Sequence, residues 1–455
     1  MNTSYDVKFW EIRRNKSSKT ASYEIRWTVG GRQRSKTRRT KALAESFLSD
    51  LRQAAKNGEA FDIATGLPVS MLAPDPKAGP TVLTFAQEYM RRRWKASAAR
   101  TRETDTYALI ALVPAFAKDL PGKPDDAELR TVLRDHALLP EDRRGELPGH
   151  RAAVLRWLET ASLPLADLQE ASVLRRGLDA ISVTFSGKKA AANTVLRKRE
   201  VLNHLLELAV EEKVLPSNPL REIKWTPPKS TEAVDPRTVV NPRQAGALLA
   251  AVTYVGRSRG PRMMALYACM YYAALRPEEA AGLRRDNCQL PDEGWGMLTL
   301  EKARPQANKR YTDSGEAHDE RGLKHRPERD TRPIPIPPVL VAILREHIKR
   351  YGVADDGRLF RTAKGRPYTA SAISRIWQEA RAIAFPPEQA ASPLAARPYD
   401  LRHAAVSLWL SAGVPATEVA QRAGHSVEVL QRVYAKCVEG QTLQANNKIT
   451  SALGD

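Results

Sequence analysis

Apolar and polar side chains alternate near the start of the chain, over residues 21–29. This period of two predicts a half-buried strand, with Tyr23, Ile25, Trp27 and Val29 on its apolar face. The Gly30–Gly31 pair that follows favours a hairpin turn and a return strand. An earlier strand is expected over 7–12, and apolar residues recur at helical spacing over 44–51. Residues 1–62 are therefore predicted to form a small sheet with one helix.

The period then lengthens to that of a helix, after a stretch rich in Pro and Gly at 63–80. Helical patterns run over 85–94 and 194–210, and polar, proline-bearing connections lie around 118–150. We predict a linker at 63–80, an all-helical domain over 81–225, and a second Pro-rich linker at 226–236.

The last part of the chain, 237–455, has a mixed pattern. An apolar helix is expected over 263–275, a strand over 295–302 and a hairpin over 322–336. Helices are predicted at about 338–351, 370–384, 401–411, 416–422 and 427–437. The prolines at 333, 335, 337 and 338 place the second hairpin arm at a sheet edge. The expected fold class is multidomain, mainly α with small β-sheets.

The net charge adds a function to these three predicted domains, the binding of a polyanion. The 455 residues include 72 Lys+Arg against 52 Asp+Glu, which gives a net charge of +20. Hydrophobic residues make up 42% of the chain, so the positive charge belongs to folded domains and not to a disordered tail. Such a balance is typical of proteins that bind nucleic acid along their length.

Other classes of protein are excluded by composition. No run of 18 apolar residues occurs, which argues against a membrane span. The polar first residues lack the apolar core of a signal peptide, so we expect a cytoplasmic protein. The three cysteines, Cys269, Cys288 and Cys437, are too scattered for a disulfide framework or a Cys-rich zinc site. The sequence lacks the phosphate-binding Gly-x-x-x-x-Gly-Lys loop, which argues against an ATPase.

Three basic runs are candidates for DNA contact. A short charge run is often only a solvated face, but the first run lies on a hairpin with aromatic side chains behind it, as in sheets that enter a DNA groove. The other two lie on helices and are expected to neutralise backbone phosphates. The candidates are Arg32, Arg34, Lys36, Arg38 and Arg39; then Arg91, Arg92 and Arg93; then Arg197, Lys198 and Arg199.

Four fragments of the last domain carry groups suited to chemistry on a phosphate. Arg276 precedes Pro277 and is therefore expected to project from a tight turn before a short helix that carries Glu279. The other fragments are Leu323–Lys324 in the predicted hairpin, the run Tyr399-Asp400-Leu401-Arg402-His403, and Gly424-His425 with Tyr434 nine residues later. Taken singly, these residues would be an ion pair, a solvated lysine and a core tyrosine.

Together and in this order, the fragments resemble the tyrosine recombinase (phage integrase) family, and the resemblance covers the whole chain. Arg276 and Glu279 match its Leu-Arg-x-x-Glu element, and Lys324 matches its hairpin lysine. Tyr399 to His403 match its His-x-Leu-Arg-His box, His425 its Gly-His element, and Tyr434 its nucleophile. The resemblance implies an N-terminal arm-binding domain, a helical core-binding domain and a mixed α/β catalytic domain.

The resemblance also implies a role for each matched residue. Arg276 and Arg402 would bind the scissile phosphate, because two planar guanidiniums neutralise the charge of the transition state. His425 would donate a further hydrogen bond, and Lys324 would protonate the departing 5′-oxygen. Tyr434 would attack to form a 3′-phosphotyrosine bond, which stores the bond energy, so neither metal nor ATP is required. Glu279 would orient Arg276 or the lysine hairpin, and His403 would be a structural neighbour.

The sequence departs from the family pattern in two places. Tyr399 stands where the family usually has histidine, and a phenol can donate a hydrogen bond but is a poor base at neutral pH. Tyr399 is therefore expected to position or stabilise the phosphate. The segment between Lys324 and Pro335 is longer than the usual family turn.

The function expected from these residues is site-specific recombination by an integrase of a phage or another mobile element. Its partners would be double-stranded attachment sites, three further copies of itself in a tetramer on DNA, and an accessory DNA-bending or directionality protein. Two alternatives stay open: a type IB topoisomerase that relaxes supercoils, and a DNA-binding regulator without activity, which the Tyr399 departure would favour.

Overall fold

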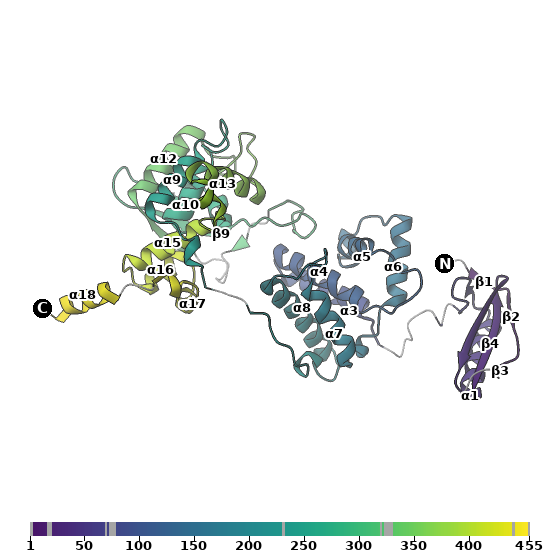
Figure 1. Cartoon of the computed structure of the whole chain (residues 1–455). Coiled ribbons are helices and arrows are strands. Elements are labelled where there is room, and N and C mark those ends of the chain that lie inside the picture. The colour runs from purple at the N-terminus through teal and green to yellow at the C-terminus, as the bar shows by residue number, and fades with distance from the viewer. Residues whose placement is uncertain are drawn as a thin grey trace. The chain divides into compact units, whose positions relative to one another are not determined.

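A computed structural model describes residues 3–15, 21–68, 71, 79–229, 233–318, 321–322, 331–438 and 442–453 (Figure 1). The chain divides into two units, one comprising residues 1–97 and 104–228 and the other residues 98–103 and 229–455. The described residues are mainly helical with small sheets, as the sequence predicts. Lys324 lies outside the described residues.

The N-terminal sheet forms as the alternating pattern predicts. Its strands are β2 (Val7–Phe9), β3 (Arg13–Asn15), β4 (Ser22–Val29) and β5 (Arg32–Arg38), and the helix α1 (Lys41–Lys56) packs on it. Gly30 and Gly31 make the hairpin turn at φ +54° and +79°, backbone angles that residues other than glycine rarely adopt. Two short strands, β1 (Thr3–Ser4) and β6 (Phe61–Asp62), pair beside it.

The register of β4 and β5 shows which face the predicted DNA-binding residues occupy. Trp27 lies opposite Arg34, and Ile25 opposite Lys36, so these cations share the face on which α1 packs. Lys36 and Arg38 lie over the Phe47 ring of α1, 4.7 Å and 5.0 Å from its centroid. The basic side chains thus do not project from the face opposite the helix. DNA contact by this strand stays a prediction.

The helical domain contains more structure than the sequence pattern indicates. Its helices are α3 (Val82–Ala96), α4 (Ala99–Ala115), α5 (Asp126–Val132), α6 (Gly149–Ala161), α7 (Ala171–Ser182) and α8 (Ala192–Glu211). The interpretation of 118–150 as connections only was wrong, because α5 and a π-helical turn (Leu133–Ala137) lie within it. Asp125 caps α5 and accepts from the backbone N–H of Ala127. The helix is only seven residues long, so its period is hard to recognise.

The basic runs of the helical domain have carboxylate and aromatic partners. Arg91 and Arg92 bind the Glu88 carboxylate at 2.6 Å and 2.7 Å, and Arg92 also pairs with Glu212. Arg93 pairs with Asp105, with 3.2 Å between Nε and Oδ2. Lys198 lies over the Phe185 ring and Arg199 over that of Trp225. Their role in DNA binding stays a prediction, and any phosphate contact by Arg91–Arg93 would compete with these ion pairs.

The last domain is built around two apolar clusters and a three-stranded sheet. Its helices are α9 (Pro242–Val252), α10 (Met264–Tyr272), α11 (Pro277–Gly282), α12 (Pro338–Tyr351), α13 (Ala370–Ala384), α14 (Pro387–Ala391), α15 (Asp400–Ser411), α16 (Ala416–Ala423), α17 (Val427–Val438) and α18 (Thr442–Leu453). The larger cluster contains Trp377 and the apolar helix α10. The smaller one joins α15, α16 and α17 around Leu430 and Tyr434.

The sheet of this domain differs from the predicted hairpin in its pairing. Its strand order is β11 (Arg332–Ile336), β8 (Gly296–Leu300) and β7 (Cys288–Gln289), so the proline-bearing arm is an edge strand as predicted. The partner of β11 is β8, and β10 (Arg321–Gly322) pairs with β9 (Lys302–Ala303). The described ends of the predicted hairpin thus each pair with another strand, and residues 323–330 between them lie outside the described residues.

Within the described ranges, no helix combines the length and the apolar content that a membrane crossing requires. His, Cys, Asp and Glu side chains in the same ranges form no group of three that could hold a metal ion.

Candidate active site

Arg276 and Glu279 form a local unit at the start of α11. Arg276 has extended backbone angles, φ −70° and ψ 152°, as expected of a residue before proline. Its backbone N–H donates to Oε2 of Glu279 at 2.9 Å, and its Nη1 donates to Oε1 at 2.7 Å. The predicted tight turn is confirmed, and the Glu279 carboxylate lies where it orients the Arg276 guanidinium.

Arg332 is a member of this cluster that the sequence analysis missed. Its Nη2 donates to Oε2 of Glu279 at 2.6 Å, and both side chains are 2% exposed. Burial alone would raise the pKa of Glu279, but the guanidiniums of Arg332, Arg276 and Arg402 lower it to about 2. One signal could have identified Arg332: it shares the buried face of β11 with Ile334 and Ile336, and a buried cation needs a partner.

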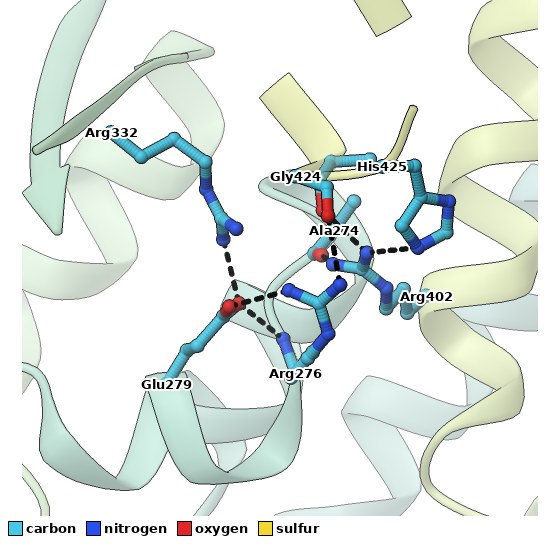
Figure 2. A network of polar contacts seen from close by, with 8 residues as sticks. Ala274, Arg276, Glu279, Arg332, Arg402, Gly424 and His425 are labelled. Carbon is cyan, nitrogen blue, oxygen red and sulfur yellow. Dashed lines mark hydrogen bonds and ion pairs between the residues drawn. The ribbon is translucent and has the colours of Figure 1, made fainter. Parts of the chain in front are cut away.

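Arg402 lies at the centre of the cluster on α15 and is fully buried. Its Nη1 donates to the carbonyl of Ala274, and its Nη2 lies 2.5 Å from the carbonyl oxygen of Ala423. Figure 2 shows Arg276 beside it, with Nη2 donating to the Gly424 carbonyl at 2.9 Å. Ala274 adopts φ +50°, a left-handed conformation that costs about 1 kcal/mol or more outside glycine. Backbone carbonyls from two separate turns thus converge on the two arginines.

His425 follows Gly424 and contacts Arg402 directly. Nη2 of Arg402 lies 2.7 Å from Nε2 of the imidazole (Figure 2). Burial, and then the positive charges of Arg402, Arg276 and Arg332, lower the pKa of His425 to about 3. The ring is therefore neutral at pH 7. Because Arg402 can only donate, Nε2 is the acceptor and the ring proton lies on Nδ1.

Tyr434 lies on α17 with its side chain buried, in contact with two histidine rings. Its hydroxyl lies 2.9 Å from Nδ1 of His403, and its ring centroid is 6.2 Å from that of His425. Tyr434 shares the buried face of α17 with Leu430, as the helical spacing predicts. His403 also stacks edge-on against Tyr399, at 5.0 Å between centroids. The sequence predicts His403 as a structural neighbour of the box, and the structure places its ring against the hydroxyl of Tyr434.

The structure brings together most of the predicted site residues from separate parts of the last domain. Arg276 binds Glu279 and also the carbonyl of Gly424, the residue before His425. Arg402 contacts His425, whose ring lies against that of Tyr434, and Tyr399 joins Tyr434 through His403. Lys324, outside the described residues, stays a prediction. The predicted DNA-binding residues lie in the N-terminal sheet and the helical domain, away from this cluster in sequence.

Known structures resemble this chain. The Tn1549 transposon integrase, solved in complex with a circular intermediate DNA, is 16% identical over 68% of this chain and 96% of its own, with a TM-score of 0.49. The XerH site-specific recombinase bound to its difH substrate is 14% identical over 81% of this chain and 94% of its own, with a TM-score of 0.43. A lambda integrase tetramer bound to a Holliday junction is 11% identical, covering 91% and 95%, with a TM-score of 0.44. No protein-family model and no curated protein matches the sequence.

Gly424 allows the arginines to approach the α16–α17 turn. It ends α16 in the left-handed conformation, at φ +65°. A Cβ atom at this position would collide with the guanidinium of Arg332 and lie 3.4 Å from Nη1 of Arg276. Both the backbone conformation and the close approach therefore require glycine.

Gly424→Ala is expected to lower the free energy of unfolding. The loss should exceed, by about 1–3 kcal/mol, that of an alanine placed at a left-handed glycine with open space around it. The reason is that the new methyl group must displace a buried guanidinium from Glu279. Gly357→Ala is the matched control, because Gly357 has φ +81° and an open space around it. Denaturant unfolding of both variants measures the difference, and equal losses would show that the Arg332 contact is unimportant.

Proposed function

We propose that this chain is a site-specific DNA recombinase of the tyrosine recombinase (phage integrase) family. It would cleave and rejoin double-stranded DNA through a 3′-phosphotyrosine bond to Tyr434, without metal or ATP. The observation that carries the proposal is that a buried tyrosine hydroxyl and a cluster of arginines and histidines meet in one site. A nucleophile beside anion-binding groups is what attack on a phosphodiester requires.

The charge of the cluster supports the binding of an anion. Three guanidiniums, those of Arg276, Arg332 and Arg402, surround the single carboxylate of Glu279. Among these described residues the positive charges therefore exceed the negative ones. Since guanidiniums bind phosphate through paired N–H groups, a phosphodiester is the ligand this excess favours.

Unpaired donors in the cluster also favour a further acceptor. Nε of Arg332, Nε of Arg402 and Nδ1 of His425 are buried, and none of them has a hydrogen-bond partner among the described residues. A buried donor without a partner costs about 1–3 kcal/mol. The oxygens of a phosphodiester would supply acceptors for such groups.

Binding of the phosphate would require the site to open. Arg402 and Tyr434 are 0% and 1% exposed, and the carbonyls of Ala274, Ala423 and Gly424 occupy the donors that phosphate oxygens would take. His425 could donate from Nε2 only after its contact with Arg402 opens and the ring proton moves to that nitrogen. We infer that the α16–α17 turn moves when DNA enters, replacing carbonyl oxygens by phosphate oxygens.

The finer parts of the proposal follow from the resemblance. The enzyme would serve the integration of a phage or another mobile element in the cytoplasm, as a tetramer on attachment sites and with an accessory DNA-bending or directionality protein. The N-terminal domain would bind arm sites, and Lys324 would protonate the 5′-oxygen that departs.

A nicked duplex tests the proposal, because loss of the short fragment beside the nick traps a covalent product. Duplexes tiled across the DNA that flanks the gene are incubated with the full chain in EDTA. We expect a protein–DNA adduct on one sequence, and none with Tyr434→Phe, which keeps the ring but removes the nucleophile. Relaxation of any supercoiled plasmid would indicate a topoisomerase instead. Specific DNA binding with no adduct would indicate a regulator.

A further inference from the structure

His403 is the histidine in direct contact with the hydroxyl of Tyr434. It follows Arg402 on α15, and its Nδ1 lies 2.9 Å from Oη of Tyr434. The two ring centroids are 5.6 Å apart. The 2.9 Å between Nδ1 and Oη is within hydrogen-bond reach, which is the first requirement of a group that takes a proton from the nucleophile.

The surroundings of His403 keep its ring neutral. Burial, and then the positive charges of Arg402 and Arg397, lower its pKa to about 4. At neutral pH the ring therefore has one nitrogen with a free lone pair. The other groups that face it are the Tyr399 phenol, the Tyr434 phenol and the neutral ring of His425. Among the described residues, no carboxylate contributes to the shift in the His403 pKa, so no negative charge offsets the two arginines.

Tyr399 is poorly suited to the same task. It stands at the position where the family usually has histidine, and a phenol can donate a hydrogen bond but is a poor base at neutral pH. Its ring contacts His403 edge-on, at an interplanar angle of 68°. Tyr399 thus supports the imidazole that in turn contacts the nucleophile.

We propose that His403 is the catalytic base for Tyr434, taking over the role that Tyr399 cannot fill. This inference rests on the proposed function. The Oη–H bond breaks and an Nδ1–H bond forms as Oη bonds to phosphorus. The bond between phosphorus and the 5′-oxygen breaks, and that oxygen takes a proton from an ammonium group, which we expect to be that of Lys324. In rejoining, a 5′-hydroxyl bonds to phosphorus and gives its proton back to the amine, while the bond between phosphorus and Oη of Tyr434 breaks. The imidazolium then returns its proton to the phenolate oxygen that leaves.

The bound phosphate would tune this base. A phosphodiester brings negative charge to the guanidiniums that disfavour protonation of His403, and so raises the basicity of the ring. General-base catalysis is most effective when the pKa of the base lies near the working pH. The ring thus stays unprotonated before DNA binds and becomes a stronger base after it.

His403→Gln tests this role, because glutamine can hold the phenol by a hydrogen bond but cannot take its proton. With a nicked duplex that the wild type cleaves, we expect cleavage at pH 7 to fall by about 10²–10⁴-fold with DNA binding unchanged. The cleavage rate of His403→Gln should rise as the pH rises toward the pKa of the phenol, whereas the wild-type rate should be constant over the same pH range. Added imidazole should restore part of the activity of His403→Ala.

The matched control is His347→Gln, another buried histidine, which contacts the carbonyl of Leu359 away from the cluster. It should cleave at the wild-type rate per folded molecule, with folding measured by thermal unfolding.

Cleavage by His403→Gln within threefold of wild type, or a loss with no rise at high pH and no rescue by imidazole, would overturn the proposal. If the wild type itself forms no adduct, the proposed function fails instead, so the two failures are distinguishable. Should neither His403 variant fold, the wild-type rate alone decides: it must fall toward acid pH as one group is protonated, and a flat profile would contradict the role.

Discussion

Replacing Arg402 by alanine is expected to reduce the rate of DNA cleavage by about 10²–10³-fold, as for the loss of one preorganised donor to a developing oxyanion. Arg402 contacts Ala274, Ala423 and His425 at once, so the substitution also removes the group that holds the two turns of the site together. The rate of adduct formation on a nicked duplex, per folded molecule, measures the effect.

Arg381→Ala is the control for the loss of a buried arginine as such. Arg381 is 5% exposed and donates to the carbonyls of Leu394 and Ser392, well apart from Tyr434 in the chain. It should reduce stability while leaving the cleavage rate of the folded fraction unchanged. Equal losses of cleavage in both variants would mean that Arg402 acts only through folding.

Glu279→Ala is expected to have the largest effect on stability, about 3–5 kcal/mol, because it leaves Arg332 and Arg276 buried without their carboxylate. The effect should depend on pH. The pKa of Glu279 is lowered to about 2 in the folded chain from an ordinary value of 4.5. Its ionised form therefore contributes stability above about pH 4.5, and this contribution is lost as the pH falls toward 2.

Denaturant unfolding of wild type and Glu279→Gln across this pH range measures the contribution. The difference between the two proteins should be largest near neutral pH and should narrow below about pH 4.5. Glu278→Gln changes the neighbouring carboxylate in the same turn and should show a small difference throughout. A wild-type advantage over Glu279→Gln that persists unchanged at acid pH would contradict the buried ion cluster.

Local patterns were enough to predict most elements, and the order of four fragments, matched to the family, indicated most of the polar residues of the described site. The alternating period identified β4, and the αL glycine and helical spacing placed Tyr434 on the buried face of α17. Proline before a short helix was enough to predict the extended turn at Arg276. These features depend on neighbours in sequence, which a linear pattern contains.

Features that depend on contacts between distant segments were not predictable in this way. The basic side chains of β5 share a face with Trp27 because of the strand register, and a shift of one residue would have turned them to the other face. Arg332 joins the site because β11 pairs with β8, and not with β10 as a hairpin would. His403 contacts Tyr434 across 31 positions of sequence, a pairing that only the packing of α15 against α17 creates.

Identification of the residue that becomes linked to DNA decides whether Tyr434 is the nucleophile. An adduct trapped on a nicked duplex in EDTA is digested with nuclease and trypsin, and the modified peptide is sequenced by mass spectrometry. Trypsin cuts after Arg432 and Lys436, so the predicted product is Val433-Tyr434-Ala435-Lys436 with a 3′-linked nucleotide on the tyrosine. A nucleotide on any other residue, or cleavage of the DNA with no protein attached, would contradict it.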